Sequence, residues 1–157
     1  MERQLKISVT DEYALALGKA LYCFNYLEKQ IIDIIVKINP NHDMAIRGHE
    51  TASEVAKVFK ETLTDYPQAH CQTELNELCS AFFVAIDPGR NKLLHAKPCT
   101  DTDGRQVLIY FSQEKELKTK TVPALYIEWP LEDLEAFMFR CEDLAIQGNS
   151  IYYNQPR

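Results

Sequence analysis

Apolar residues recur with a seven-residue pattern in the first part of the chain and predict one long amphipathic helix that ends near Ile38. Its start can be capped by Ser8 followed by Asp11, or by Thr10 itself. Asn39-Pro40-Asn41 ends it, because proline cannot continue a helix. Residues 1–9 are expected to be an extended lead-in. The predicted apolar seam consists of Ala14, Leu17, Leu21, Phe24, Ile31, Ile35 and Ile38.

Three further helices are predicted from the same kind of pattern. One runs from about residue 51 or 53 to residue 63, and a third helix begins near residue 72. The last starts after Pro130 and is expected to stop at Gly148-Asn149. Their predicted buried positions are Val55, Val58, Phe59 and Leu63, then Leu75, Leu78, Phe82, Ala85 and Ile86, and finally Leu131, Leu134, Met138, Cys141 and Ala145.

Asp87-Pro88-Gly89 interrupts the third helix shortly before its end. Proline has no N–H to donate to the carbonyl of Val84, so the helix either kinks here or stops and restarts with Asp87 as its cap. In both cases Arg90 lies in a first helical turn or just after a kink. Backbone amides left free at this point add local positive potential, which suits an anion.

The pattern changes from helix to strand after His95. Lys97-Pro98 stops the helix, and residues 106–111 have strand composition. A charged connection over residues 113–120 leads to a second strand around residues 124–129. These two strands are expected to form an antiparallel hairpin.

The fold class that follows is mainly α. We predict a helical bundle of about four long helices, with a small antiparallel β-hairpin inserted before the last helix. A third short strand near residues 98–101 is an open alternative. A chain of 157 residues is long enough to build its own core, and no repeat or linker divides it, so we expect a single domain over residues 1–157.

Composition narrows the classes of function and partner. The net charge of −6 disfavours broad binding to nucleic acid, so any such site must be a local basic pocket. The apolar stretches are broken by charges and are shorter than the ~20 residues that span a bilayer. Residues 1–4 lack the apolar core of a signal peptide. We therefore expect a cytoplasmic protein without a membrane partner.

The cysteines and histidines give little sign of metal or redox chemistry. The cysteines are odd in number and widely spaced, which favours reduced thiols; they are Cys23, Cys71, Cys79, Cys99 and Cys141. The polar connection that holds His42, Asp43, His49 and Glu50 matches no metal-binding spacing. We predict neither a metal site nor a cofactor.

Glu28 is the one charged residue within the predicted seam of the first helix. A carboxylate in an apolar seam costs free energy unless it is paired or reaches water. Glu28 therefore either sits at the edge of the seam, or pairs with a structural cation, or faces a cation in a functional cleft. Asn25, one turn earlier, could share that surface.

The run Arg90-Asn91-Lys92-Leu93-Leu94-His95 is the main candidate for chemistry. Histidine can act as a base or acid near neutral pH, and arginine matches phosphate oxygens bidentately. These groups suit RNA cleavage, in which a base activates a 2′-hydroxyl and a cation stabilises the charge on the phosphate. Asn91 could orient His95 or donate to a phosphate, and Glu28 could raise the pKa of His95 or hold Arg90.

The spacing of the run favours a site shared between two subunits. On one helix Arg90 and His95 are about 140° apart around the axis and ~7.5 Å apart along it, so they do not share a face. A two-fold axis can place the same run of a second copy alongside the first. The alternative is a structural role, in which Arg90 and His95 compensate the dipole at a helix end.

The run, together with Asn25-Tyr26-Leu27-Glu28 in the first helix, resembles the HEPN (higher eukaryotes and prokaryotes nucleotide-binding) superfamily. Its signature is an arginine, four to six residues and a histidine, often with a polar residue after the arginine. The resemblance maps Arg90 and His95 onto the defining residues and Asn91 onto the polar position. Glu28 is a looser match to an acidic residue of the first helix.

The resemblance implies a helical bundle and a homodimer that pairs two motifs in one cleft. It also implies metal-independent cleavage of RNA in toxin–antitoxin, phage-defence or RNA-processing systems, with an antitoxin protein as a possible partner. Some members bind nucleotides, RNA or protein without cutting, so a non-catalytic binding module is the second hypothesis. A helical assembly protein, with Arg90 and His95 as surface residues, is the third.

Overall fold

The computed structural model describes residues 7–156, except for the side chains of Ala45 and Ile46. Residues 1–6, which include the four residues of the signal-peptide expectation and most of the predicted lead-in, lie outside the described residues. The helices are α1 (Asp11–Ile38), α2 (Met44–Arg47), α3 (Ala52–Asp65), α4 (Gln72–Val84), the π-helical segment η1 (Ala85–Arg90), α5 (Asn91–Leu94) and α6 (Leu131–Asn154). The strands are β1 (Lys97–Thr100), β2 (Gln106–Ser112), β3 (Lys115–Leu117), β4 (Lys120–Val122) and β5 (Leu125–Trp129).

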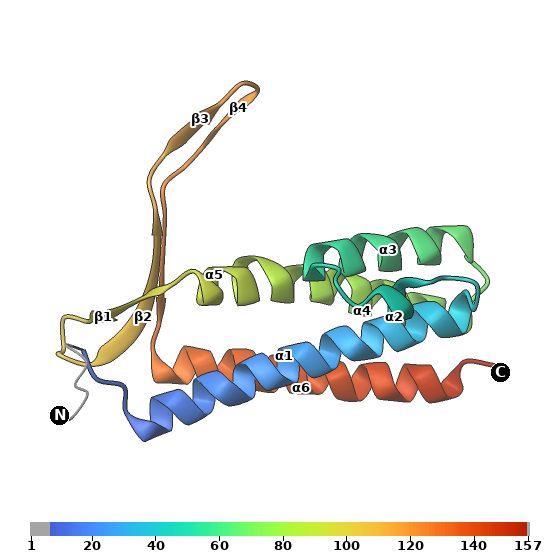
Figure 1. The fold of residues 1–157 in the computed structure, drawn as a ribbon, viewed down its shortest axis with the longest axis horizontal. Helices are drawn as coiled ribbons and strands as arrows, with labels where there is room; N and C mark the ends of the chain where they lie inside the picture. The colour runs from blue at the N-terminus through green and yellow to red at the C-terminus, as the bar shows by residue number, and fades with distance from the viewer. Residues whose placement is uncertain (1–6, 157) are drawn as a thin grey trace.

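The long helices α1 and α6 run side by side in the same direction, with α3 and α4 packed along them (Figure 1). The β-sheet lies at the end where α1 and α6 begin, and it precedes α6 in the chain. The prediction of a mainly α bundle is therefore confirmed. No helix of the described residues is both long and apolar enough to cross a membrane.

The β-structure is larger than the predicted hairpin. Strands β1, β2 and β5 form an antiparallel three-stranded sheet in the order β1-β2-β5, so the third strand near residues 98–101 exists. The charged connection also forms a separate antiparallel ribbon of β3 and β4, which projects from the body (Figure 1). All side chains of this ribbon are exposed. With no buried face, the ribbon has no hydrophobic alternation from which it could be predicted.

The buried face of α1 differs from the predicted seam in the first half of the helix. Thr10 caps this helix, its hydroxyl accepting from the N–H of Tyr13 at 3.2 Å. Ala14 is exposed, and Leu17 and Leu21 are only half-buried. The buried residues are Tyr13, Ala16, Ala20, Phe24, Leu27, Gln30, Ile31, Ile34 and Ile35.

The hydrogen bonds of Tyr13 determine which face of α1 is buried. The Tyr13 hydroxyl donates to the carbonyl of Trp129 at 2.6 Å and accepts from the N–H of Leu108 at 3.1 Å. These bonds fix the first turn of α1 on the sheet. Since α1 is apolar on almost every side here, periodicity alone could not select the buried face.

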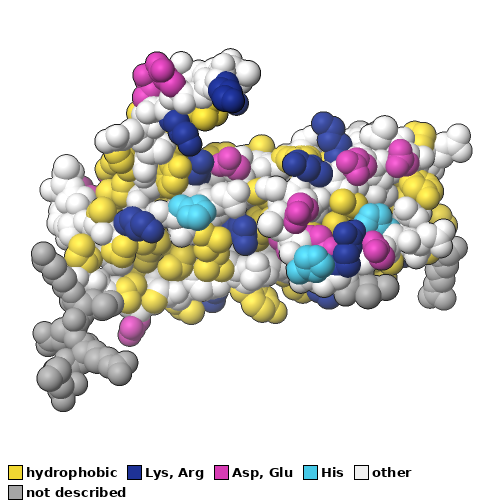
Figure 2. All heavy atoms as spheres, turned by 45° about the horizontal axis from the view of Figure 1, so that its top comes forward, with side chains coloured by type: hydrophobic (Ala, Val, Ile, Leu, Met, Phe, Trp, Pro, Cys, Tyr) yellow, Lys and Arg dark blue, Asp and Glu magenta, His cyan; other side chains and the backbone are white. Residues whose placement is uncertain are grey.

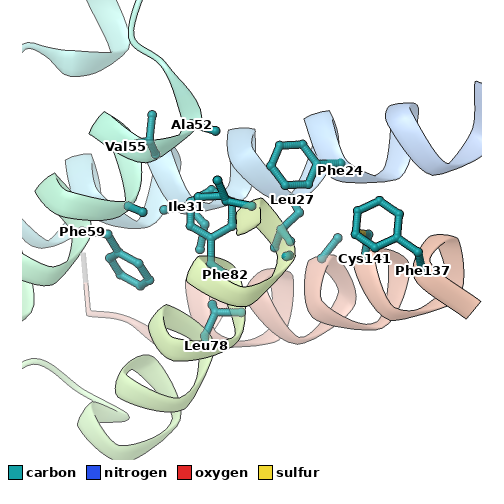
Figure 3. Packing of buried hydrophobic residues seen from close by; sticks show 14 of the residues in the cluster. Phe24, Leu27, Ile31, Ala52, Val55, Phe59, Leu78, Phe82, Phe137 and Cys141 are labelled. Atoms are coloured by element: carbon teal, nitrogen blue, oxygen red, sulfur yellow. The ribbon is translucent and has the colours of Figure 1, made fainter. Parts of the chain in front are cut away.

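The core lies where α1, α3, α4 and α6 meet. The rings of Phe24 and Phe82 stack with centroids 5.9 Å apart, and Phe59 and Leu78 pack nearby (Figure 3). The predicted buried positions of the third helix, which lie in α4 and η1, are confirmed. A capping box at Thr51 starts α3, close to the predicted start.

The last helix does not stop at Gly148-Asn149 as predicted. It continues to Asn154, and Gly148 is buried within it. A Cβ at Gly148 would lie 3.5 Å from Gln30 and 3.8 Å from Leu78, which are ordinary contact distances, so the helix continues through a position where a methyl would also fit. The buried Ile151 holds the next turn.

Two glycines give a matched prediction for stability. Gly148→Ala introduces a methyl at ordinary contact distance and improves helix propensity, so it should raise the free energy of unfolding by about 0.5–1 kcal/mol. Gly89→Ala places a methyl 2.7 Å from the Phe137 ring and should lower it by about 1–3 kcal/mol. Urea unfolding of both variants checks this. Equal effects of the two substitutions on the free energy of unfolding would contradict the close contact between position 89 and the Phe137 ring.

Candidate functional site

The helix that carries the candidate run breaks at Asp87 and resumes after it. Asp87 has extended dihedral angles (φ −143°, ψ 117°), whereas Arg90 and Asn91 have helical ones. The helix is therefore kinked at Asp87, and the predicted restart with Asp87 as its cap is not found among the described residues. The carboxylate of Asp87 forms no cap and instead lies 3.5 Å from the Lys92 ammonium.

The Arg90 side chain lies on α1. It is half-buried, with its guanidinium carbon 5.4 Å from the centroid of the Phe24 ring. One of its N–H groups donates to the side-chain carbonyl of Asn91 at 3.2 Å. The Phe24 ring and the Asn91 amide thus hold the guanidinium against the bundle.

Glu28 lies one turn after Phe24 and faces the same cation. It is half-buried at the edge of the apolar stripe, where Leu27 occupies the fully buried position. Burial raises the pKa of Glu28, and the nearby Arg90 guanidinium partly opposes this by lowering it. Glu28 therefore both sits at the seam's edge and neighbours a cation. Among the described residues the two groups form no direct ion pair.

His95 and Asn25 occupy different surroundings. His95 is exposed at the end of α5, where its backbone N–H donates to the carbonyl of Asn91 at 3.2 Å. Asn25 is exposed on α1. The structure thus brings Arg90, Asn91 and Glu28 together, while the side chains of His95 and Asn25 form no hydrogen bond with them in the part of the chain that is described. Arg90 and His95 differ in burial.

Two neighbours of the run were not identified from the sequence. Phe24 was assigned only to the core, although its ring also supports Arg90. Lys92 lies 4.7 Å from the centroid of the Tyr110 ring, which joins the run to β2. The only feature of the sequence that pointed to Lys92 was its position inside the run. Figure 2 shows Lys and Arg side chains and a histidine side chain set among hydrophobic ones on the half of the molecule that carries the sheet.

The surroundings of Glu28 predict a pH-dependent contribution to stability. Because its pKa is raised in the folded state, the folded protein holds the proton more tightly, and stability is lost as the pH rises through the folded pKa. Glu28→Gln cannot ionise. Its free energy of unfolding relative to wild type should therefore increase between about pH 4 and pH 7. Urea unfolding at several pH values measures this, and a pH-independent difference would contradict the assignment.

Neither metal binding nor thiol chemistry is supported by the side chains of the described residues. In residues 7–156, no group of three or more His, Cys, Asp and Glu side chains is placed to hold a metal ion. The five cysteines are unpaired within the described chain, and burial raises the pKa of Cys141 to about 12. That thiol stays protonated at neutral pH.

No family model, curated protein or solved structure matches this chain.

Proposed function

We propose that the chain is a metal-independent endoribonuclease of the HEPN type that works as a homodimer. The observation that carries this proposal is the arrangement around Arg90. An aromatic ring at position 24 and the side-chain amide of Asn91 hold a half-buried guanidinium close to the carboxylate at position 28, and an exposed His95 follows on the same short segment. An arginine held in this way is pre-organised for a phosphate.

His95 acts as the general base or general acid in the proposed reaction. As base, it removes the proton from a ribose 2′-hydroxyl, and the oxygen attacks the adjacent phosphorus. The bond from phosphorus to the 5′-oxygen breaks, and that oxygen takes up a proton as it leaves. The products are a 2′,3′-cyclic phosphate and a free 5′-hydroxyl. Arg90 stabilises the charge on the phosphoryl oxygens, and Asn91 and Glu28 support the arginine.

A single copy of the run from Arg90 to His95 is not sufficient both to hold the phosphate and to move the proton. Arg90 is turned towards α1, and His95 faces solvent at the other end of the segment. A second copy brings a second histidine and a second arginine to a shared cleft, so that one subunit can hold the phosphate while the other moves the proton. The resemblance to HEPN proteins supports a cytoplasmic toxin–antitoxin, phage-defence or RNA-processing setting, with an antitoxin protein as a partner.

A substrate comparison tests the reaction class. Purified protein in excess EDTA is incubated with an RNA and with the same oligonucleotide in which every ribose is 2′-deoxy. The mechanism predicts cleavage of the RNA alone, with 2′,3′-cyclic phosphate ends that mass spectrometry identifies. Cleavage of the deoxy oligonucleotide, or RNA products with 5′-phosphate ends, would exclude attack by the 2′-hydroxyl.

The second candidate function is RNA binding without cleavage. Phe111 and Tyr126 lie directly opposite each other on β2 and β5 and are 61% and 57% exposed. Exposed aromatic pairs can stack on the bases of single-stranded RNA, at ~1–3 kcal/mol per base. Filter binding should then weaken in the Phe111→Ala, Tyr126→Ala double variant. RNA retained by wild type without cleavage would favour this function.

A further inference from the structure

The ribbon of β3 and β4 contributes nothing to the core of the described chain. All of its side chains are exposed, and its two strands pair only with each other. A two-stranded ribbon without a buried face is at best marginally stable in water. Packing therefore does not account for the residues found in it, whereas contact with another molecule would. In Figure 1 the ribbon projects away from the helices.

The register divides the ribbon into two chemically different faces. Residues directly opposite each other in an antiparallel pair point to the same side, and side chains alternate along each strand. One face therefore carries two lysines and two aliphatic side chains, and the other carries a carboxylate and a hydroxyl. The first face, called the lysine face below, consists of Lys115, Leu117, Lys120 and Val122, and the second of Glu116 and Thr121.

The ribbon is a local concentration of positive charge on an acidic chain. Residues 115–122 contain three lysines and one glutamate, whereas the whole chain has 17 Lys and Arg against 23 Asp and Glu. The third lysine, Lys118, lies in the turn. Among the described residues none of these lysines forms an ion pair. Positive charge on a projecting arm attracts a polyanion, since affinity for nucleic acid comes from cations that neutralise phosphates.

Strand β2 joins the ribbon to the candidate run. The Lys92 ammonium lies 4.7 Å from the centroid of the Tyr110 ring. Lys115 follows Tyr110 by five residues, at most about 17 Å of extended chain. Figure 2 shows Lys and Arg side chains on the ribbon as well as on the half of the body that carries the sheet, on one face of the molecule. A strand of RNA bound at the run can therefore also reach the ribbon.

We propose that the lysine face of the ribbon binds the phosphate backbone of a single-stranded RNA, several nucleotides away from the bond that is cleaved at the run. The choice of RNA as the polyanion rests on the proposed function. The two lysines neutralise phosphates, and the two aliphatic side chains beside them contact sugars and bases. Phosphate contacts position a nucleic acid without reading its sequence, so the ribbon selects long RNA over short RNA.

An anionic membrane is the other polyanion that a lysine face could meet. The aliphatic side chains Leu117 and Val122 are only 43% and 37% exposed, and residues 115–122 include no aromatic side chain to anchor at a membrane surface. A flat anionic surface would also approach the acidic body of the protein, whereas a flexible strand can follow the ribbon alone. These features favour RNA.

Binding is measured with an oligonucleotide that the proposed reaction cannot cleave. Fluorescence anisotropy follows a labelled single strand of about 20 nucleotides with 2′-O-methyl at every ribose. Combined Lys115→Gln and Lys120→Gln should weaken its binding ~10-fold or more at about 0.1 M salt, and the slope of log K against log salt should become shallower by ~1.4, the value for two phosphate contacts on a single strand. No binding by wild type, or equal affinities of the two proteins, would overturn the proposal.

Two matched variants distinguish the lysine face from charge in general. Lys115→Glu combined with Glu116→Lys keeps the net charge of the ribbon but moves a positive charge to the other face, so it should also weaken binding. Lys57→Gln combined with Lys60→Gln removes the same charge from exposed positions on α3 and should bind as wild type does. An equal loss in the α3 variant would show a general charge effect and overturn the proposal. Thermal unfolding monitors the fold of each protein.

Cleavage of two substrates separates the ribbon from the reaction. With Lys115→Gln and Lys120→Gln, kcat/KM should fall on RNA of about 20 nucleotides by the same factor as the affinity, and much less on a dinucleotide, which has a single phosphodiester. Wild type that binds the long strand through the lysine face but cleaves no RNA would retain the ribbon contact and remove the ribonuclease. Cleavage with unchanged kcat/KM on the long RNA would do the reverse.

A vesicle assay covers the alternative polyanion. Wild type should not sediment with vesicles of phosphatidylserine and phosphatidylcholine. Sedimentation of wild type but not of the Lys115→Gln, Lys120→Gln protein, without binding to the oligonucleotide, would replace RNA by a membrane as the partner of the lysine face.

Discussion

Arg90→Ala is expected to lower RNA cleavage by at least ~100-fold, the cost of removing one pre-organised donor from a developing anion. The guanidinium is already held between the Phe24 ring and the Asn91 amide, so its position does not depend on the substrate. Arg90→Lys keeps the charge but loses the planar pair of donors, and its rate should fall between those of wild type and Arg90→Ala.

The measurement is the initial rate on one labelled RNA at saturating and subsaturating concentrations. Arg140→Ala removes an arginine that is exposed on α6, and it should cleave at the wild-type rate. If Arg90 stabilises the transition state, kcat falls at saturating RNA. A change in KM alone would show that Arg90 only binds RNA, and equal losses in the Arg90 and Arg140 variants would indicate a general charge effect.

Phe24→Ala is expected to have the largest effect on stability, about 3–5 kcal/mol of the free energy of unfolding. The ring is fully buried and stacks on Phe82 in the centre of the core. Phe24→Leu keeps much of the volume and should cost less than about 1.5 kcal/mol. It also removes the ring beneath Arg90, so cleavage should fall even though the protein remains folded.

Urea unfolding and cleavage rates of the same preparations distinguish these roles. Phe111→Ala removes an exposed ring from β2 and should change stability by no more than about 0.5 kcal/mol. A Phe24→Leu protein with full cleavage activity would show that the ring serves packing only.

The parts of the fold that the sequence predicted are those where burial produces a repeating pattern of apolar residues. The buried positions of the third predicted helix, the start of α3 near residue 51 and the strand that forms β2 all follow from local patterns. The orientation of α1 does not, because the hydrogen bonds of Tyr13 to the sheet select one face of a helix that is apolar nearly all round. The predicted stop at Gly148 is wrong, since a glycine inside a helix looks the same in sequence as one that ends a helix.

The candidate site could be predicted only in part for the same reason. The spacing of Arg90 and His95 along the chain indicated that they would not share a face. The sequence placed Glu28 in the seam but could not show that it lies at the edge beside Arg90. The role of Phe24 beneath the guanidinium depends on two segments that are distant in the chain, and no local pattern records such a contact.

The central claim is tested most directly by RNA cleavage in excess EDTA, with wild type and His95→Ala compared on the same RNA. His95 is exposed, so the substitution should leave thermal unfolding unchanged. We predict that wild type cleaves and that His95→Ala cleaves ~10²–10⁴-fold more slowly, the contribution of a general base or acid. Equal rates in the two proteins, or no cleavage of several RNAs by wild type, would contradict the account.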